Sequence, residues 1–324
     1  MWDKYPFIRE EVAALEEYIL EKFPREGEFL DLVSKNVINS GGKRLRPVLA
    51  ILSAMFGDYS REKIFPVAAA LETLHTATLI HDDIIDNAET RRGQPSVFSK
   101  HGINMAVYTG DYLLVKALLL LSEAGLPTEK LKDIAKAMEA LCLGEVEQYL
   151  SRHRLITPRE YLKRIMRKTG ILLSASCALG AFVTGCPEEQ VRLLGRFGMY
   201  FGTAFQIRDD LLDLEATDAN APEIGKPVVN DLKEGIVTIP VILAIRKNDT
   251  LREQVQNYFE GMGDVRNIVA GVMRSGGHEE ARRLRDRYID KCLHILEKLP
   301  SAEHRKVMED SVLWLQEEVQ PIPA

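Results

Sequence analysis

The sequence is dominated by long stretches rich in Leu, Ala, Glu and Lys in which apolar residues recur at intervals of three and four. This spacing places the apolar residues on one face of an α-helix, and the alternating β-branched runs that indicate strands are nearly absent. Pro47 follows a Gly-Gly turn and Thr157-Pro158 has the form of a helix start. The pattern predicts an all-α protein. Since there is no solenoid period or low-complexity linker, it favours one domain over residues 1–324.

The charge balance bears on the partners that the chain can hold. Lys and Arg number 42 against 48 Asp and Glu, which gives a net charge of −6. Because the chain as a whole presents no positive field, we expect no nucleic-acid partner. The most apolar stretch, Leu113–Leu121, is short and interrupted by Lys116, so we also expect no transmembrane segment. A hydrophobic substrate would then be held in a cavity of the protein or at a membrane surface.

The four cysteines lie far apart in the sequence and form no C-x-x-C pair; they are Cys142, Cys177, Cys186 and Cys292. This spacing argues against a zinc site or a disulfide framework and fits a reducing compartment. We therefore expect a cytoplasmic protein in which all four are buried small side chains.

The sharpest local feature is a pair of acidic sequences, HDDIID and RDDLLD, each at the end of an apolar helical run. Each places two carboxylates four residues apart on one helix face: Asp82 with Asp86, and Asp209 with Asp213. Like charges at this spacing repel, and acidic residues at a helix C-terminus oppose the helix dipole. A bound cation would remove both costs.

Hard oxygen ligands with room for water and phosphate are typical of Mg²⁺ sites. For a single acidic stretch, a solvated helix end is the commoner explanation, but here the same spacing occurs twice. Calcium storage is a weaker alternative, because neither stretch has the alternating ligands and turn glycine of an EF-hand loop. The pattern favours magnesium ions held with a diphosphate.

Positive charge lies where an anionic substrate would need it. Lys43 and Arg46 come just ahead of the helix expected to open at Pro47, and a helix N-terminus attracts phosphate. Arg91 and Arg92 follow the first acidic cluster, and Lys168-Thr169 begins another apolar helical run. Singly, each of these cations is more often a surface charge. Together with the carboxylates they indicate a site for two diphosphates, one held through metal and one held directly.

These residues and their surroundings resemble the trans-type (all-E) isoprenyl diphosphate synthase family. The matching segments run in the family's order from about residue 41 to 240: GGKRLRP, HTATLIHDDIIDNAETRRG, GDYLL, GEVEQ, KTGILLSAS, FGTAFQIRDDLLDL and GKPVVNDLKEGIVTIP. The resemblance implies the all-α isoprenoid synthase fold, with helices packed around a deep central cavity. It places six catalytic aspartates at the cavity mouth: Asp82, Asp83, Asp86, Asp209, Asp210 and Asp213.

The resemblance also assigns roles position by position. It implies Mg²⁺ ligands at Asp82, Asp86 and Asp209. It implies isopentenyl diphosphate contacts at Lys43, Arg46, His75 and Arg92. It implies allylic diphosphate contacts at Arg91, Lys168, Thr169, Gln206 and Lys226, with Lys168 also counted as catalytic. One departure is Ile236, at a position where many members have a Lys that helps to hold the leaving diphosphate.

The implied activity is that of a prenyltransferase, a Mg²⁺-dependent polyprenyl diphosphate synthase that adds isopentenyl diphosphate sequentially to an allylic diphosphate. We expect the irregular segment Ala216–Asn230 to close over the site and exclude water. One turn before Asp82 lie two small residues, Ala77 and Thr78, where short-chain members often carry an aromatic plug. A medium or long product, in the hexaprenyl to octaprenyl range used for quinone side chains, is therefore expected. Farnesyl or geranylgeranyl synthesis is the alternative, if a helix such as the one containing Tyr112 plugs the cavity.

Two lower-ranked hypotheses remain. A class I terpene cyclase also ionises an allylic diphosphate but needs no second diphosphate site. A non-catalytic regulatory subunit should have lost carboxylates or cations. The family implies a homodimer, or a heterodimer with a small non-catalytic subunit, and Leu118–Leu121 is either cavity wall or dimer interface. Peripheral contact with a membrane would serve product release.

Overall fold

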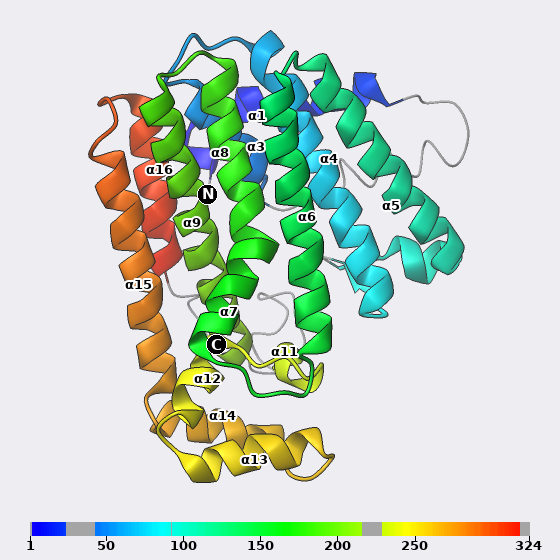
Figure 1. Cartoon of the computed structure of the whole chain (residues 1–324), viewed down its shortest axis with the longest axis vertical. Helices are drawn as coiled ribbons and strands as arrows, with labels where there is room; N and C mark the ends of the chain where they lie inside the picture. Colours follow the sequence, from blue (N-terminus) through cyan, green and yellow to red (C-terminus); the bar gives the residue numbers. More distant parts are fainter. Residues whose placement is uncertain (1, 24–42, 92, 216–228, 318–324) are drawn as a thin grey trace. The chain divides into compact units, whose positions relative to one another are not determined.

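The computed structural model describes residues 2–23, 43–91, 93–215 and 229–317 (Figure 1). Within these residues the secondary structure is helical except for one short antiparallel pair, β1 (Thr90–Arg91) and β2 (Gln94–Pro95). The all-α prediction is therefore confirmed. The apolar positions at intervals of three and four, rather than two, are the physical reason.

The chain is organised as two compact units. Unit 1 comprises Met1–Ile134, Leu173–Gly198 and Leu299–Met308, and unit 2 comprises Ala135–Leu172, Met199–Lys298 and Glu309–Ala324. Our expectation of one domain over residues 1–324 stays a prediction.

Unit 1 is built around α3 and α4. Its described elements are η1 (Trp2–Lys4), α1 (Pro6–Lys22), α3 (Leu45–Ala54), α4 (Arg61–Ile85), β1, β2, α5 (Val97–Glu123), and parts of α6 (Thr128–Leu150), α8 (Ile171–Val183), α9 (Glu188–Glu215) and α16 (Glu303–Leu313). The centre of α3, residues 48–52, is fully buried. Gly180 of α8 lies so close to α3 that an added Cβ would be 2.1 Å from the Ala50 carbonyl oxygen. Helix α4 packs along α5 and against α3 (Figure 1).

Helix α5 has one buried and one exposed apolar face. Leu113, Ala117 and Leu120 are buried, whereas Val115 and Leu118 are at least half exposed. By length and composition alone α5 is the one helix of the described residues that could cross a membrane, with a mean hydropathy of 1.4 and 39% of that window buried. Core helices of soluble proteins meet the same criteria, so our expectation of no transmembrane segment stays a prediction.

Unit 2 contains the rest of α6, α8, α9 and α16 together with α7 (Pro158–Ile165), the π-helical turn η2 (Met166–Gly170), α11 (Asn230–Lys233), α12 (Ile239–Ile245), α13 (Asp249–Phe259), α14 (Val265–Arg274), α15 (Gly277–Leu296) and η3 (Trp314–Gln316). All seven residues of α12 are buried, and α12 packs against α15, α13 and α14 (Figure 1). A capping box starts α7: the Thr157 hydroxyl accepts from the Glu160 N–H, and the Glu160 carboxylate accepts from the Thr157 N–H. Tyr161, Arg164 and Ile165 form its buried face.

Two details correct the sequence analysis. Cys142 is exposed, whereas Cys177, Cys186 and Cys292 are buried as expected. Cys142 lies on α6 between the buried residues Leu141 and Gly144, and it is exposed together with its neighbour Leu143. The helix expected to open at Pro47 begins at Leu45, after Arg44 in a left-handed conformation, so Arg46 lies inside its first turn.

Candidate active site

The first acidic cluster ends helix α4 in unit 1. Asp82 and Asp83 occupy its last turn, and Asp86 is the C-cap residue, whose N–H donates to the Asp82 carbonyl at 2.9 Å. Asp83 is 4% exposed, Asp82 is half-buried and Asp86 is exposed. The cluster therefore divides into one inward-facing carboxylate and two that solvent or a ligand can reach.

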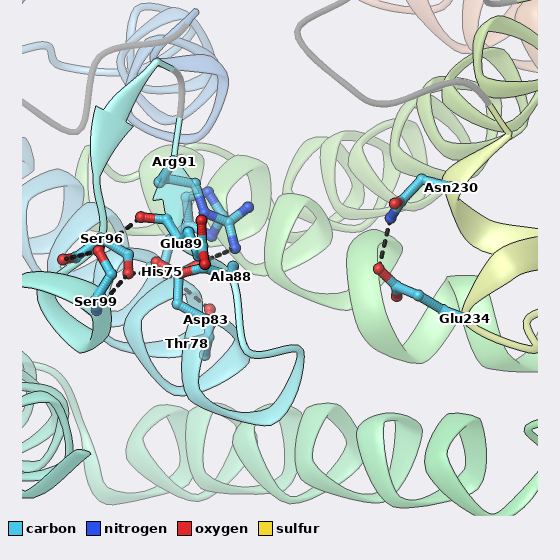
Figure 2. Close-up of polar contacts among 10 residues, drawn as sticks. All are labelled: His75, Thr78, Asp83, Ala88, Glu89, Arg91, Ser96, Ser99, Asn230 and Glu234. Atoms are coloured by element: carbon cyan, nitrogen blue, oxygen red, sulfur yellow. Dashed lines mark hydrogen bonds and ion pairs between the residues drawn. The ribbon is translucent and has the colours of Figure 1, made fainter. Parts of the chain in front are cut away.

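Arg91 holds the buried carboxylate of this cluster. Its Nε donates to Asp83 Oδ1 at 2.7 Å, and its Nη2 forms an ion pair with the same oxygen (Figure 2). Burial raises the pKa of Asp83, and the hydrogen bonds and charge of Arg91 act against that rise. Arg91, which the resemblance assigns to the allylic diphosphate, is thus engaged with Asp83.

The turn that carries Arg91 is fixed to the start of α5. Ser96, the N-cap of α5, donates its hydroxyl to the Ala88 carbonyl at 2.6 Å and its N–H to the Glu89 carbonyl at 3.0 Å. Ser99 donates its hydroxyl to the Glu89 carbonyl at 2.7 Å, and Figure 2 shows these side chains gathered beside Arg91. Ser96 thus caps α5 and also holds residues 88 and 89. These bonds keep the turn close to α4, where Arg91 reaches Asp83.

The second acidic cluster lies near the end of α9 in unit 2. Asp210 is 3% exposed and accepts three hydrogen bonds. The Tyr161 hydroxyl donates to Oδ2 at 2.6 Å, Gln206 Nε2 donates to Oδ1 at 3.1 Å, and the Ile239 N–H donates to Oδ2 at 3.4 Å. Burial and the charge of Asp231 raise the pKa of Asp210 to about 7, against the effect of the Tyr161 and Gln206 hydrogen bonds. Asp210 is therefore a structural anchor inside unit 2.

The other carboxylates of this cluster differ from Asp210. Asp209 is half-buried, and Asp213 is buried and accepts the Asn230 N–H at 3.0 Å. Both clusters thus bury the second aspartate of the DD pair and leave the first within reach. Among the described residues, no three His, Cys, Asp or Glu side chains already form a metal-binding group. The ligand roles of Asp82, Asp86 and Asp209 stay predictions.

The predicted isopentenyl diphosphate residues lie in unit 1. Lys43 is exposed and precedes α3, Arg46 is half-buried in its first turn, and His75 is half-buried on α4. The Thr78 hydroxyl donates to the His75 carbonyl at 2.8 Å (Figure 2). The fourth residue of this set, Arg92, lies outside the described residues, as does Lys226 of the allylic set.

Arg44 was missed by the sequence analysis, although it belongs to the quoted GGKRLRP segment. Its Nη1 contacts Glu72 Oε1 at 2.8 Å, and its Nη2 contacts Glu16 Oε1 at 3.1 Å. These ion pairs connect the start of α3 to α4 and α1. Since both acidic partners are distant in sequence, only the fold reveals that Arg44 positions the turn carrying Lys43 and Arg46.

Lys168 and Thr169 lie within the π-helical turn η2, between α7 and α8, rather than at a new helix start. Such turns often mark functional sites because the extra residue redirects the side chains. Lys168 Nζ pairs with Glu145 Oε2 at 2.8 Å, and the Thr169 hydroxyl donates to Gln206 Oε1 at 2.9 Å. The structure therefore brings together Thr169, Gln206 and the second acidic cluster within unit 2, and it adds Glu145, to which the sequence analysis gave no role.

The predicted closing segment is mostly outside the described residues, since 216–228 are not described. Asn230, which we placed at its end, is instead the first residue of α11, and its side-chain amide donates to Glu234 Oε1 at 2.6 Å (Figure 2). Glu215, just before the segment, is held by His278 at 2.6 Å and Arg282 at 2.8 Å. Ile236 is 8% exposed and belongs to the apolar interior of unit 2.

Comparison with known proteins gives a consistent result. The profile of the family described as polyprenyl synthetase matches residues 28–272. Heptaprenyl diphosphate synthase component 2 of Geobacillus stearothermophilus is 39% identical over 318 residues, covering 96% of this chain and 97% of that protein. Nonaprenyl diphosphate synthase of Mycobacterium tuberculosis is 33% identical, covering 93% of this chain and 90% of that protein. The crystal structure of heptaprenyl diphosphate synthase from Staphylococcus aureus has a TM-score of 0.88 at 30% identity, over 95% of this chain and 98% of that one.

The raised pKa of Asp210 predicts a pH-dependent stability. Between about pH 4 and pH 7 the folded chain holds a proton on Asp210 that the unfolded chain has released, so this group's contribution to the free energy of unfolding falls as pH rises. Asp210→Asn removes that contribution. Urea unfolding without Mg²⁺ at pH 5 and pH 7.5 should show wild type losing more stability than the variant on the move to pH 7.5. Equal losses would contradict the buried, protonatable Asp210.

Proposed function

The chain belongs to the polyprenyl synthetase family, and we propose that it condenses isopentenyl diphosphate with an allylic diphosphate in a Mg²⁺-dependent reaction. It has the all-α isoprenoid synthase fold and is a prenyltransferase of the polyprenyl diphosphate synthase type. The observation that carries the proposal is the common organisation of the two acidic clusters. Each buries and anchors the second aspartate of its DD pair, Asp83 or Asp210, beside carboxylates suited to hard cations.

The residues present fit magnesium. Asp82, Asp86 and Asp209 supply hard oxygen atoms and are not fully buried, which leaves room for water and phosphate oxygens. Bound Mg²⁺ would neutralise the charge that develops on a departing diphosphate. The chain itself contributes the cation of Lys168 on η2 and the hydroxyl of Thr169 on the same turn.

The two diphosphates are distinguished by the cations that hold them. We assign isopentenyl diphosphate to Lys43, Arg46, His75 and Arg92. We assign the allylic diphosphate to Arg91, Lys168, Thr169, Gln206 and Lys226. The allylic carbon–oxygen bond breaks and releases diphosphate, and the double bond of isopentenyl diphosphate attacks the allylic carbon. The released diphosphate accepts the proton whose loss restores a double bond. No nucleophile of the chain is needed, so its work is to orient both substrates, stabilise the leaving diphosphate and exclude water.

We propose a medium or long product. Relatives named heptaprenyl, nonaprenyl and octaprenyl diphosphate synthases support this length. A geranylgeranyl diphosphate synthase of Sulfolobus acidocaldarius is 44% identical over 217 residues, which keeps a short product as the alternative. In that case half-buried Tyr112 of α5 is the candidate plug within unit 1.

We also propose that a second protein chain covers the exposed face of α5. Tyr108, Val115, Leu118 and Leu119 form an apolar stripe on this helix and are 64%, 57%, 50% and 52% exposed. Leu120 and Leu121 are buried, so the Leu118–Leu121 segment serves both the core and this face. The name "component 2" in two relatives indicates a multi-subunit enzyme in those organisms. We propose a homodimer first and a heterodimer with a small non-catalytic subunit second. We place the protein in the cytoplasm, with membrane contact only for product release.

The rival hypotheses are less well supported. A terpene cyclase has no use for the cations that we assign to isopentenyl diphosphate. A regulatory subunit would have no need to keep all six aspartates, and Ile236 is the one departure from the cation pattern that we identified.

The first test uses the purified chain with Mg²⁺, isopentenyl diphosphate and farnesyl diphosphate, followed by mass analysis of the products. Asp82→Ala should reduce turnover by about a thousandfold, the effect of losing several kcal/mol of charge stabilisation. Circular dichroism should show an unchanged fold. Asp58→Ala, which alters a carboxylate 86% exposed elsewhere in unit 1, is the control and should retain activity. Near-normal activity of Asp82→Ala would refute the metal role.

Product length tests the role of the small residues on α4. Ala77→Phe adds an aromatic ring one turn from Asp82 and should shorten the main product by one or more isoprene units. Because Ala77 is fully buried, the half-buried Thr78→Phe provides a second variant with a smaller packing cost. Thermal melts accompany the mass analysis. Unchanged products from both folded variants would place the end of the cavity elsewhere.

The exposed stripe of α5 is tested by the mass of the chain in solution. Leu119→Lys puts a charge into the proposed interface, so sedimentation should show a shift from dimer to monomer. Leu131→Lys is the control, since Leu131 is 39% exposed on α6 and lies outside the stripe. A wild-type monomer that gains activity only with a second, smaller protein would contradict the homodimer and support the heterodimer. A stable Leu119→Lys dimer would exclude this face.

A further inference from the structure

Tyr161 is a buried residue of unit 2 to which the proposed reaction gives no role. It is 1% exposed on α7, and its hydroxyl reaches Asp210 Oδ2, 49 residues further along the chain, at 2.6 Å. The other two donors to Asp210 are farther away, at 3.1 Å and 3.4 Å. Tyr161 therefore supplies the shortest of the three hydrogen bonds that hold this buried carboxylate.

The hydrogen bonds continue from Asp210 to the predicted allylic diphosphate residues. Gln206 Nε2 donates to Asp210 Oδ1, and Gln206 Oε1 accepts from the Thr169 hydroxyl at 2.9 Å. Asp210 Oδ1 accepts from Gln206 Nε2, so the amide nitrogen of Gln206 faces Asp210. The amide oxygen on the other side of the same group faces Thr169. The orientation of both side chains thus depends on how firmly Asp210 is held.

The same face of α7 fixes the segment before α12. Arg164 Nη2 donates to the Val237 carbonyl at 3.1 Å, and the Ile239 N–H donates to Asp210. The Arg164 guanidinium also lies 5.6 Å from the centre of the Tyr161 ring. One turn of α7 therefore holds α9 through Tyr161 and the 237–239 segment through Arg164. The Tyr161 ring is therefore held at its hydroxyl by Asp210 and on its face by Arg164.

We propose that Tyr161 is a positioning residue for the allylic diphosphate: through Asp210 and Gln206 it orients Thr169 on η2 and fixes the helix face that presents Asp209. Tyr161 touches no substrate in this arrangement. The inference rests on the proposed function, since it takes Thr169 and Gln206 as allylic diphosphate contacts. The proposal predicts an effect on allylic diphosphate binding alone. The hydrogen bonds from Tyr161 stay within unit 2, whereas the residues assigned to isopentenyl diphosphate belong to unit 1.

Tyr161→Phe removes the hydroxyl and keeps the ring, so it tests the hydrogen bond with little loss of packing. The Michaelis constant for farnesyl diphosphate should rise about tenfold, as expected for one hydrogen bond to a charged group. The constant for isopentenyl diphosphate should stay within about twofold of wild type. The matched control is Tyr288→Phe, a tyrosine 6% exposed on α15 of the same unit, which should leave both constants unchanged.

A purely structural role gives a different result. It would lower the melting temperature of Tyr161→Phe without separating the two Michaelis constants, and that outcome overturns the proposal. A double-mutant cycle adds a second criterion: if Tyr161 acts through Asp210, then Tyr161→Phe should add nothing to the farnesyl diphosphate effect of Asp210→Asn. Additive effects would show that Tyr161 acts by another route.

Binding without turnover separates this inference from the proposed function. Farnesyl diphosphate and Mg²⁺, without isopentenyl diphosphate, are titrated calorimetrically into wild type, Tyr161→Phe and Tyr288→Phe. About tenfold weaker binding in Tyr161→Phe alone supports the positioning role even if wild type forms no product. Equal binding in all three overturns it even if wild type is an active synthase. Absence of binding to wild type would refute both.

Discussion

The burial of the second aspartate of each DD pair is the constraint on which the proposed site depends. A carboxylate inside a helical core is unstable unless donors surround it, and Asp83 and Asp210 meet this need with different partners, Arg91 and Tyr161. Neighbouring residues of an α-helix are about 100° apart around its axis. Once Asp83 points inward, Asp82 and Asp86 must share a different face. In the first cluster, buried Asp83 therefore determines where Asp82 and Asp86, two of the proposed metal ligands, point.

The Lys168 cation is paired but remains partly exposed. Lys168 pairs with Glu145 while both side chains are roughly a quarter exposed, at 29% and 23%. Ion pairs of this kind contribute about 0–1 kcal/mol, because water competes for both partners. A diphosphate carries more charge than a single carboxylate and can displace Glu145 at small cost. Under the proposed function, the pair would hold Lys168 ready for the allylic diphosphate and reduce the ordering needed when that substrate binds.

Much of this organisation could be predicted from local sequence. The spacing of apolar residues gave the helices, and the position of each acidic sequence after an apolar run correctly placed the clusters at the ends of α4 and α9. What escaped prediction depends on contacts between distant segments. Tyr161 appears in sequence as one more apolar residue of a short amphipathic helix, and nothing near it indicates Asp210. Cys142 was assigned to the core from its residue type alone, although it lies on the exposed side of α6.

Helix α5 has more apolar surface than its packing against α4 requires. The charge pattern on its exposed side indicates which kind of partner would cover that surface. By composition the helix is apolar enough for a membrane, yet Asp111, with its side chain 63% exposed, lies between Tyr108 and Val115 on the same stripe. A carboxylate at mid-helix facing lipid would be costly. At a protein interface it can find a donor, and here His81 already lies 3.4 Å away. The charge pattern of the exposed face thus favours a protein partner over lipid, and it accounts for an apolar helix that the core of unit 1 buries on one side only.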